Sequence, residues 1–327
     1  MVASGDWQAW LRAAVETFTT TIAGLAFETL PFLLLGTLLA AAIQAFVPDR
    51  ALRRLFPRNR FASIAVALVI GAIVPICECG TVPLAKRLRQ KGLPLSTAAA
   101  FLLAAPLANP MTIISTYVAF RDTGHRIFVY RLAVGLASAL ILALFVEWAS
   151  RRRPSLDITD RVRGFSRLTE SAIPRPPRLR VVARPRFGLG ARIADALDHA
   201  TVDFLDSARF LVLGISVAAL ARAIIPIRLL SGGLGGKVQA AATGTLSAYV
   251  LSLCSSADAF VARALFAPAS YGAALSFLAL GPMIDIKNTI LLSRSIRPKE
   301  LAIFVLAIFA AVVAMSLLFS PVMEALP

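Results

Sequence analysis

Charged side chains are scarce in this sequence. They make up 16% of the 327 residues, whereas hydrophobic residues make up 58%, and the mean hydropathy is +0.76. Soluble globular domains average about 25% charged residues. The shortage of charge therefore excludes an ordinary soluble domain, and the excess of apolar residues predicts an all-α polytopic membrane protein.

The apolar residues gather in stretches that are long enough to cross a membrane. A helix needs ~20 residues to cross a hydrocarbon core of ~30 Å. We expect about eight such spans, of which the second, sixth and seventh are interrupted by proline, glycine or charged residues. The predicted spans are residues 22–47, 61–84, 95–119, 128–148, 204–227, 238–258, 269–293 and 301–323.

Acidic residues are few, 18 against 34 basic ones, which gives a formal net charge of +16. Such an excess could indicate nucleic-acid binding. However, twelve of the basic residues are arginines between Arg151 and Arg192, in a segment with several prolines and few acids. This distribution is typical of a cytoplasmic linker that follows the positive-inside tendency. We therefore predict no nucleic-acid partner, and a basic linker at 151–200 between transmembrane repeats at 1–150 and 201–327.

The chain contains an internal repeat. Residues 27–48 align without gaps with residues 205–226, and residues 101–113 resemble residues 277–290. Secondary transporters are often built from such repeats, with discontinuous helices at the centre. We therefore predict two homologous halves with broken helices, parallel if each half has four spans and inverted if the number is odd. The aligned segments pair Glu28 with Asp206, Gly36 with Gly214, Pro106 with Pro282, and Asn109 with Asp285, and between them Cys79 falls opposite Cys254 at nearly the same offset.

The basic residues do not all agree with four spans in each half. With the linker in the cytoplasm, this count also places residues 86–92, of sequence KRLRQKG, on the cytoplasmic side. It leaves the arginines between Arg50 and Arg60 outside, which the positive-inside tendency disfavours. Either the ICECG region at 76–80 is re-entrant or one span is miscounted.

Two prolines, Pro75 and Pro83, enclose the sequence ICECGTV directly after an apolar run. Proline interrupts helical hydrogen bonding, and the freed backbone groups are tolerated at membrane depth only where protein or a water-filled cavity satisfies them. Interrupted segments recur at 104–110, 252–258 and 280–288. Because such breaks form the substrate sites of many secondary transporters, we predict the site here.

Cysteine is rare, with three in the whole chain. Cys77 and Cys79 stand two positions apart in the first break, where a disulfide between them would need a strained ring. Thiolates prefer soft ions, namely copper(I), zinc and, by extension, arsenic(III). The three cysteines therefore predict a site that binds a thiophilic solute or a metal. The alternative is that they only pack in apolar surroundings, above all Cys254.

Four ionisable residues fall inside the broken segments: Glu78, Asp258, Asp285 and Lys287. A charge at the centre of a span costs ~2.5–3.5 kcal/mol on insertion scales, and it marks a pathway, a proton relay or an ion pair. Asp285 and Lys287 can partly neutralise each other. If transport is coupled to protons, we predict Glu78 and Asp285 as the carriers.

The segment GAIVPICECGTVPLAKRLRQKGLPLSTAAAFLLAAPLANPMTI, residues 71–113, resembles the signature region of the YraQ-like bacterial permeases, which are related to the ArsP-type organoarsenical efflux permeases. The resemblance covers nearly the whole chain. It implies an inner-membrane permease and, in the ArsP-type branch, export of trivalent organoarsenicals through cysteine thiols. The second half has LCSSAD in place of CECG and so keeps one cysteine.

The candidate substrate-binding residues come from two sources. The motif of the resembling family implies Cys77, Cys79, Gly80, Pro83, Pro106, Asn109 and Pro110. The breaks and the repeat add Glu78, Cys254, Asp258, Pro282 and Asp285. Among these residues, the cysteines Cys77, Cys79 and Cys254 are the candidate metal ligands.

No Walker motif occurs, which leaves no predicted ATP site. We therefore predict a secondary permease of the inner membrane rather than an enzyme, without a cofactor, whose partners are the lipid bilayer and a small or metalloid solute. A membrane thiol oxidoreductase is an alternative, although that class usually has CxxC pairs. Further alternatives are a homo-oligomer, or one subunit of a two-protein permease that docks through the basic linker.

Overall fold

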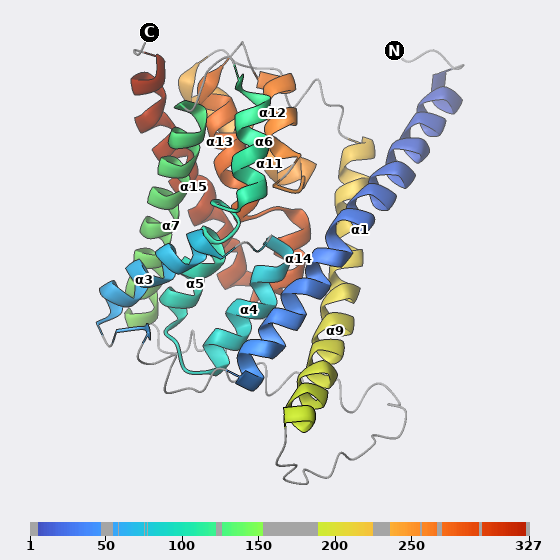
Figure 1. Cartoon of the computed structure of the whole chain (residues 1–327). Helices are drawn as coiled ribbons and strands as arrows, with labels where there is room; N and C mark the ends of the chain where they lie inside the picture. Colours follow the sequence, from blue (N-terminus) through green and yellow to red (C-terminus); the bar gives the residue numbers. More distant parts are fainter. Residues whose placement is uncertain are drawn as a thin grey trace.

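A computed structural model describes residues 6–46, 55–57, 59–74, 76, 78–121, 126–152, 189–224, 236–255, 257–266, 270–293 and 296–324. Within these residues all regular secondary structure is helical, which confirms the all-α prediction (Figure 1). The helices are α1 (Asp6–Phe46), α3 (Arg60–Ile73), α4 (Glu78–Gln90), α5 (Leu95–Ala104), α6 (Pro110–Ala119), α7 (Arg126–Arg152), α9 (Leu189–Ile224), α11 (Lys237–Leu251), α12 (Asp258–Phe266), α13 (Tyr271–Met283), α14 (Ile286–Ser293) and α15 (Pro298–Glu324).

Five of the predicted spans coincide with helical segments that are long and apolar enough to cross a membrane. They lie in α1, α7 and α9, in α13 together with α14, and in α15. This finding confirms a multi-pass membrane protein. The five segments are Leu11–Ile43, Arg126–Arg152, Ala200–Ile224, Tyr271–Ser293 and Pro298–Ser320.

The other three predicted spans are divided between shorter helices. Residues 61–84 contain α3 and the start of α4, residues 95–119 contain α5 and α6, and residues 238–258 contain α11 and the first residue of α12. Pro110 is the first residue of α6, where proline is tolerated but the residue before it avoids helical geometry. Ser252 ends α11 with a left-handed φ of 47°. The count of eight spans stays a prediction.

Helix α3 runs alongside α5 in the same direction. Near the start of both helices, Ser63 Oγ lies 2.9 Å from Thr97 Oγ1. Near their ends, Gly71 packs against Ala104, so closely that a Cβ on Gly71 would meet the Ala104 Cβ at 3.2 Å. The start of α3 therefore lies at the same end of the molecule as the start of α5.

Helix α4 runs alongside α1, also in the same direction. Gly80 in the first turn of α4 packs directly against Gly36 of α1. Just beyond the other end of α4, the Lys91 ammonium donates to the carbonyl of Ile43, near the end of α1, at 3.1 Å. Helices α3 and α4, here called the first hairpin, therefore enter and leave at the same end of the molecule.

Helix α11 packs alongside α13, as α3 packs alongside α5. Gly244 of α11 packs against the Ala273 carbonyl near the start of α13. Further along, the Tyr249 hydroxyl donates to Thr289 Oγ1 of α14, at 3.2 Å. Tyr249 comes after Gly244 in α11, and its partner Thr289 comes after Ala273 along α13 and α14. Helices α11 and α13 therefore run in the same direction.

Helix α12 returns beside α13 in the opposite direction. Asp258, its first residue, lies next to Gly281 near the end of α13. At the other end of α12, the rings of Phe266 and Phe277 are 5.6 Å apart between centroids. Helices α11 and α12, here called the second hairpin, thus enter and leave at one end. Figure 1 shows α11 and α12 in the upper part of the molecule and α3 and α4 in the lower part.

The first hairpin places basic residues at the start of α3 and just after α4 at the same end of the molecule. Arg60 at the start of α3 forms an ion pair with Glu147 near the end of α7, at 2.9 Å. Lys91 reaches the end of α1, as described above. The start of α3, the end of α4 and the end of α7 thus share one end of the molecule. This arrangement agrees with the expectation that the ICECG region is re-entrant, and the number of crossings stays a prediction.

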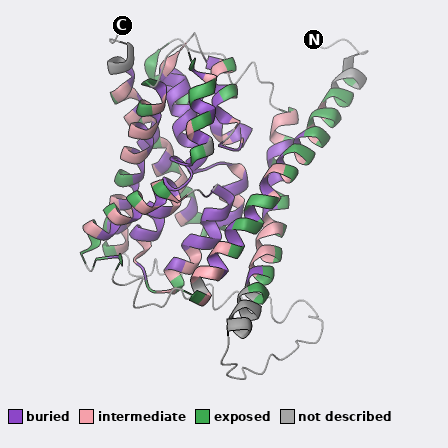
Figure 2. Cartoon of the chain, viewed as in Figure 1, coloured by how far each residue is buried: buried purple, intermediate pink, exposed green. Residues whose placement is uncertain are grey.

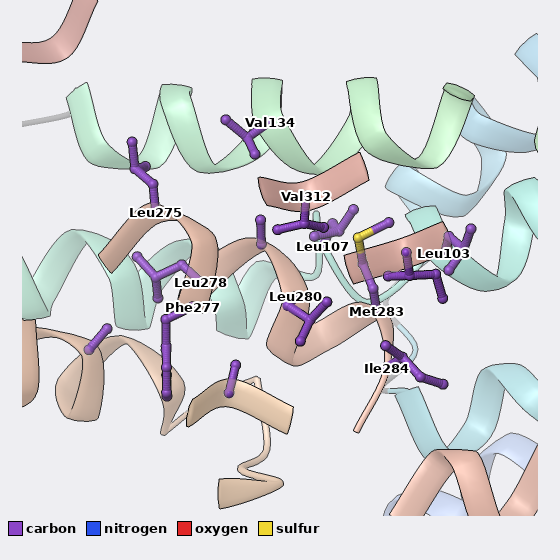
Figure 3. Packing of buried hydrophobic residues seen from close by; sticks show 14 of the residues in the cluster. Leu103, Leu107, Val134, Leu275, Phe277, Leu278, Leu280, Met283, Ile284 and Val312 are labelled. Carbon is purple, nitrogen blue, oxygen red and sulfur yellow. The ribbon is translucent and has the colours of Figure 1, made fainter. Parts of the chain in front are cut away.

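Helix α13 forms the centre of the packing. Residues 272–285 are all buried, and 83% of the span window in Tyr271–Ser293 is buried, against 28% to 44% in the other four spans (Figure 2). Leu280 and Met283 pack against Leu103 and Leu107, which lie at and just after the end of α5 (Figure 3). Protein therefore surrounds α13, and the core joins elements from both parts of the chain.

Candidate functional site

Lys287, the second residue of α14, is completely buried and contacts three separate segments. Its ammonium donates to the carbonyls of Ser252 and Leu253, just after α11, at 3.2 and 3.4 Å. It forms an ion pair with Asp285 and lies 3.3 Å from Oε1 of Glu78, the first residue of α4. Lys287 therefore connects the tips of both hairpins with the break between α13 and α14.

At the break between α13 and α14, side-chain oxygens accept hydrogen bonds from backbone N–H groups. Asp285 Oδ1 accepts the N–H of Asn288 at 2.7 Å, which caps the start of α14. Ser252 Oγ accepts the N–H of Ile286 at 3.2 Å. These bonds explain how a helix can stop and restart in a buried position, because each bond pairs an N–H group that would otherwise lack a partner.

The Glu78 carboxylate has fewer hydrogen bonds than the Asp285 carboxylate and the Ser252 hydroxyl. It is 2% exposed, and its first-turn position on α4 suits a carboxylate because the helix dipole is positive there. Among the described residues, neither of its carboxylate oxygens has a hydrogen-bond partner. The 3.3 Å contact with Lys287 is close enough for an ion pair but does not have hydrogen-bond geometry.

A second buried ion pair joins α7 to α12. Arg131 and Asp258 are each 1% exposed, and two guanidinium nitrogens of Arg131 donate to the two carboxylate oxygens of Asp258, one of them at 3.1 Å. Arg131 also donates to Thr116 Oγ1 of α6 at 2.7 Å. This bidentate arrangement, the strongest geometry for an arginine–carboxylate pair, holds the second hairpin against α6 and α7.

Two glycines allow α1 and α9 to approach the site closely. Gly36 of α1 contacts Gly80 of α4, beside Cys79. Gly214 of α9 lies against the backbone of Lys287, where a Cβ would meet the Lys287 Cα at 2.8 Å. Gly80, predicted as a substrate-binding residue, is thus a point of close helix packing.

The cysteines lie at the tips of the two hairpins. Cys79 follows Glu78 on α4 and is 1% exposed. Cys254 is 4% exposed and follows Leu253, whose carbonyl binds the Lys287 ammonium. Cys77 lies outside the described residues. In the part of the chain that the structure describes, no group of three His, Cys, Asp or Glu side chains could hold a metal ion.

The remaining predicted residues lie around the breaks. Pro106 and Asn109 are buried between α5 and α6, where the Pro106 carbonyl accepts a bond from Thr112 Oγ1 at 3.3 Å. Pro110 begins α6 and is exposed. Pro83 is buried inside α4, and Pro282 is buried in the last turn of α13. The structure therefore brings Glu78, Cys79, Asp285 and the Cys254 segment together around Lys287.

Sequence reasoning missed Arg131 and Asn288. The sequence signal for Arg131 is a basic residue inside the predicted span 128–148, which is a possible partner for the predicted acid Asp258. Asn288 is 2% exposed, and within the described residues its Oδ1 has no hydrogen-bond partner. An asparagine in an apolar segment gives a weak signal, because it carries no charge.

Membrane-spanning helices, interrupted helices and buried ion pairs at the interruptions define a multi-pass membrane protein with a polar centre. A family model, ArsP_1, described as "Predicted permease", matches residues 14–321. The chain therefore belongs to this family of permeases, which confirms the resemblance to YraQ-like permeases.

Two relatives align with most of this chain, and a third aligns with part of it. The UPF0718 protein YcgR of Bacillus subtilis is 30% identical over 291 residues, which cover 89% of this chain and 92% of YcgR. A putative two-component membrane permease complex subunit of Streptococcus mutans is 31% identical over 278 residues, 85% of this chain and 86% of that protein. The UPF0718 protein YraQ of Escherichia coli is 28% identical over 137 residues, 40% of this chain and 39% of YraQ. No solved structure matches the chain.

Proposed function

We propose that this protein is a secondary permease of the inner membrane that exports a small thiophilic solute, such as a trivalent organoarsenical or a metal-related species, through a central site. The observation that carries the proposal is the meeting of both hairpin tips at Lys287. Each tip carries a buried cysteine, Cys79 or Cys254, directly after a residue that contacts Lys287. Cys77, two positions before Cys79 in the sequence, is the third cysteine of the proposed site.

We propose further that the chain consists of two homologous halves, 1–150 and 201–327, related by an inverted repeat. Supporting this, α3 packs on α5 as α11 packs on α13, and α5 packs on α7 as α13 packs on α15. Contacts between the halves follow the same correspondence, in which α4 is equivalent to α12 and α6 to α14. Helix α4 packs against α14, and α12 packs against α6. The two hairpins enter from opposite ends, as an inverted arrangement requires.

The positive-inside tendency suggests the orientation. Exposed or partly exposed basic residues gather at the end of the molecule where the first hairpin enters, among them Arg60, Lys91 and Arg151. The arginine-rich segment between α7 and α9 is attached to the same end, because it follows Arg152. We place this end in the cytoplasm. The first hairpin then separates the central site from the cytoplasm, and the second hairpin separates it from the outside.

The test is transport into everted membrane vesicles, in which export appears as uptake. The probes are methylarsenite, arsenite, copper(I) and zinc. The wild type is compared with Cys77→Ser, Cys79→Ser and Cys254→Ser, at equal protein levels in the membrane. Uptake of one probe that is lost in the serine variants supports the thiol site. Uptake that survives all three substitutions refutes it and leaves a permease whose site is formed by the charged residues.

A second candidate is a permease that works only with another protein. The Streptococcus mutans relative is named as a subunit of a two-component membrane permease complex, and 85% of this chain aligns with it. Co-purification of a tagged chain from its native membrane tests this candidate. A stoichiometric second membrane protein would support it, whereas transport by the purified chain alone in proteoliposomes would argue against it.

A further inference from the structure

Three arginines, Arg60, Arg151 and Arg152, gather where α3 begins and α7 ends, and are here called the arginine cluster. Glu147 Oε1 accepts a hydrogen bond from Arg60 at 2.9 Å and another from Arg151 at 2.8 Å, so two guanidinium groups meet at one oxygen. The guanidinium of Arg152 lies over the Trp148 ring, 4.2 Å from its centroid. Figure 1 shows α3 beside the lower part of α7. The carboxylate and the ring thus hold the three guanidinium groups close together.

The arginine cluster has an excess of positive charge. Glu147 is the only acidic residue in the sequences of α3, α5 and α7, and it compensates one of the three arginine charges. Helix α15 also packs against α7, but its Glu300 lies 3.9 Å from Arg297 in an ion pair. The cluster and Glu147 together therefore carry about two positive charges at neutral pH.

The arginine cluster also has unused hydrogen-bond donors. A guanidinium has five N–H groups. Among the described residues, Glu147 accepts one of them from Arg60 and one from Arg151, and its second oxygen accepts the hydroxyl of Ser96 at 2.8 Å. The side chains of Arg60 and Arg151 are still 50% and 57% exposed. The remaining donors can therefore bind an anion that approaches from outside the protein.

A stripe of apolar side chains on α7 leads away from the arginine cluster. Ile141, Phe145 and Trp148 precede Arg152 at helical spacing, which places all four residues on one face of the helix. The rings of Phe145 and Trp148 stack at 6.0 Å between centroids. Ile141 is 41% exposed and Trp148 is 50% exposed. This face of α7 is thus open to the membrane and has an arginine at its end.

The stripe has the length of one lipid leaflet. A helix rises ~1.5 Å per residue, so Ile141 and Arg152 are ~16 Å apart along the axis. Half of a hydrocarbon core of ~30 Å is ~15 Å. Tryptophan is enriched at the level of the lipid headgroups. This comparison places Trp148 and Arg152 among headgroups and Ile141 among acyl chains.

We propose that the arginine cluster and the apolar stripe bind one anionic phospholipid, in the leaflet on the side where the first hairpin enters. The lipid phosphate accepts hydrogen bonds from Arg60, Arg151 and Arg152, because planar guanidinium groups suit phosphate oxygens. An acyl chain lies along Phe145 and Ile141. The lipid thereby links the start of α3 to the end of α7.

The two parts of the site define this class of ligand. A zwitterionic lipid carries its own cation and leaves the positive excess uncompensated, whereas a lipid such as phosphatidylglycerol brings a net negative charge. A soluble phosphate would contact the arginines but not the apolar stripe. The basic residues lie at the end of the membrane span, where basic side chains of other membrane proteins bind anionic headgroups. This site does not depend on which solute the protein transports.

The first experiment uses Trp148 as the reporter. The chain has three tryptophans, so Trp7→Phe with Trp10→Phe leaves Trp148 alone. The full chain is reconstituted in phosphatidylcholine bilayers with a rising fraction of brominated phosphatidylglycerol or of brominated phosphatidylcholine with the same chains. Bromine quenches the fluorescence of a tryptophan in contact with the lipid. Half-maximal quenching is expected at about a tenfold lower fraction of phosphatidylglycerol.

Variants of the arginine cluster test the origin of this preference. In the single-tryptophan background, Arg152→Gln removes one charge without unpairing Glu147, and is expected to lower the preference about fivefold. Arg152→Lys keeps the charge but loses the planar guanidinium, so its preference should be intermediate. The matched control is Arg126→Gln, which removes an exposed arginine at the opposite end of α7 and should leave the preference unchanged.

The second experiment distinguishes a lipid from a soluble phosphate. Thermal unfolding of the delipidated full chain in detergent is measured with phosphatidylglycerol, phosphatidylcholine, glycerol phosphate or inorganic phosphate. A ligand that binds the folded protein raises Tm. Phosphatidylglycerol is expected to raise Tm most, and the increase should be smaller in Arg60→Gln, where Arg151 still pairs with Glu147. Arg126→Gln should retain the full increase.

Three results would overturn the lipid site. The first is equal quenching by the two brominated lipids. The second is a preference for phosphatidylglycerol that is the same in Arg152→Gln as in the wild type. The third is an increase in Tm with inorganic phosphate as large as that with phosphatidylglycerol, which would show an anion site without a lipid. Neither experiment involves transport, so a failure of the proposed thiol site would not change these results.

Discussion

Arg131 of α7 and Asp258 of α12 form a buried bidentate ion pair, with each side chain 1% exposed. The pair links α7 to the tip of the second hairpin, and Thr116 extends the link to α6. Unlike the cluster around Lys287, it is balanced in charge. A positioning role therefore explains the pair, because it fixes the start of α12 against α6 and α7.

Removing one partner of this pair should be severely destabilising. Arg131→Met leaves Asp258 buried without its counter-ion, which typically costs about 3–5 kcal/mol. The measurement is thermal unfolding of the purified protein in detergent. The double variant Arg131→Met with Asp258→Asn should be more stable than Arg131→Met alone, because no buried charge remains unpaired. Arg151→Met, which removes a largely exposed arginine, is the control and should change stability little.

The contact between Gly36 and Gly80 predicts a second stability effect. In a helix, glycine to alanine normally gains ~1 kcal/mol. At Gly36 the added Cβ would overlap the backbone of Gly80, so Gly36→Ala should instead cost about 1–3 kcal/mol. Gly24 lies on the same helix, and no atom lies within 4 Å of the position that an added Cβ would take, so Gly24→Ala should be neutral or stabilising. Equal effects at both glycines would contradict the close approach of α1 and α4.

The hairpins predict a pattern of labelling by a membrane-impermeant maleimide. In a cysteine-free background, Arg60→Cys and Gln90→Cys should react from the same side of the membrane, because both ends of the first hairpin lie there. Lys237→Cys and Ala264→Cys, at the ends of the second hairpin, should react from the opposite side. Intact cells and everted vesicles distinguish the sides. Reaction of Arg60→Cys and Gln90→Cys from opposite sides would show that residues 61–84 are a crossing.

Two buried serines should respond differently to alanine. Ser252 Oγ accepts the N–H of Ile286, so Ser252→Ala should cost about 1–3 kcal/mol by leaving that N–H unpaired. Ser138 is completely buried and, within the described residues, its hydroxyl has no partner. Ser138→Ala should therefore be neutral or stabilising. Thermal unfolding of both variants in one detergent tests the contrast, and a larger loss for Ser138→Ala would be evidence against it.

Much of the site was predictable because charge in an apolar segment is conspicuous. Glu78, Asp285 and Lys287 stand out in the sequence as ionisable residues near prolines, and the structure brings them together. Their pairing was only partly predictable. Lys287 was expected to neutralise Asp285 two positions away, but its proximity to Glu78 depends on how the first hairpin and α14 meet.

The path of the chain was harder to predict than its helical character. Hydropathy separates apolar from polar stretches, but a hairpin that turns back inside protein is as apolar as a crossing. Residues 61–84 and 238–258 therefore give a hydropathy signal similar to that of the five long apolar helices, although each is divided between two shorter helices. The positions of the basic residues disagree with four spans in each half. The sequence does not give the direction of α4, because that direction depends on contacts between distant residues, such as Lys91 with Ile43.

The hairpins also influence how a protein of this design can change over time. A segment that enters and leaves on one side makes no net crossing, so its length can vary without reversing any helix that follows it. Residues at its tip can be substituted while the surrounding spans keep their orientation in the bilayer. Substitutions at the two tips are therefore expected to disturb membrane insertion less than substitutions in the long apolar helices.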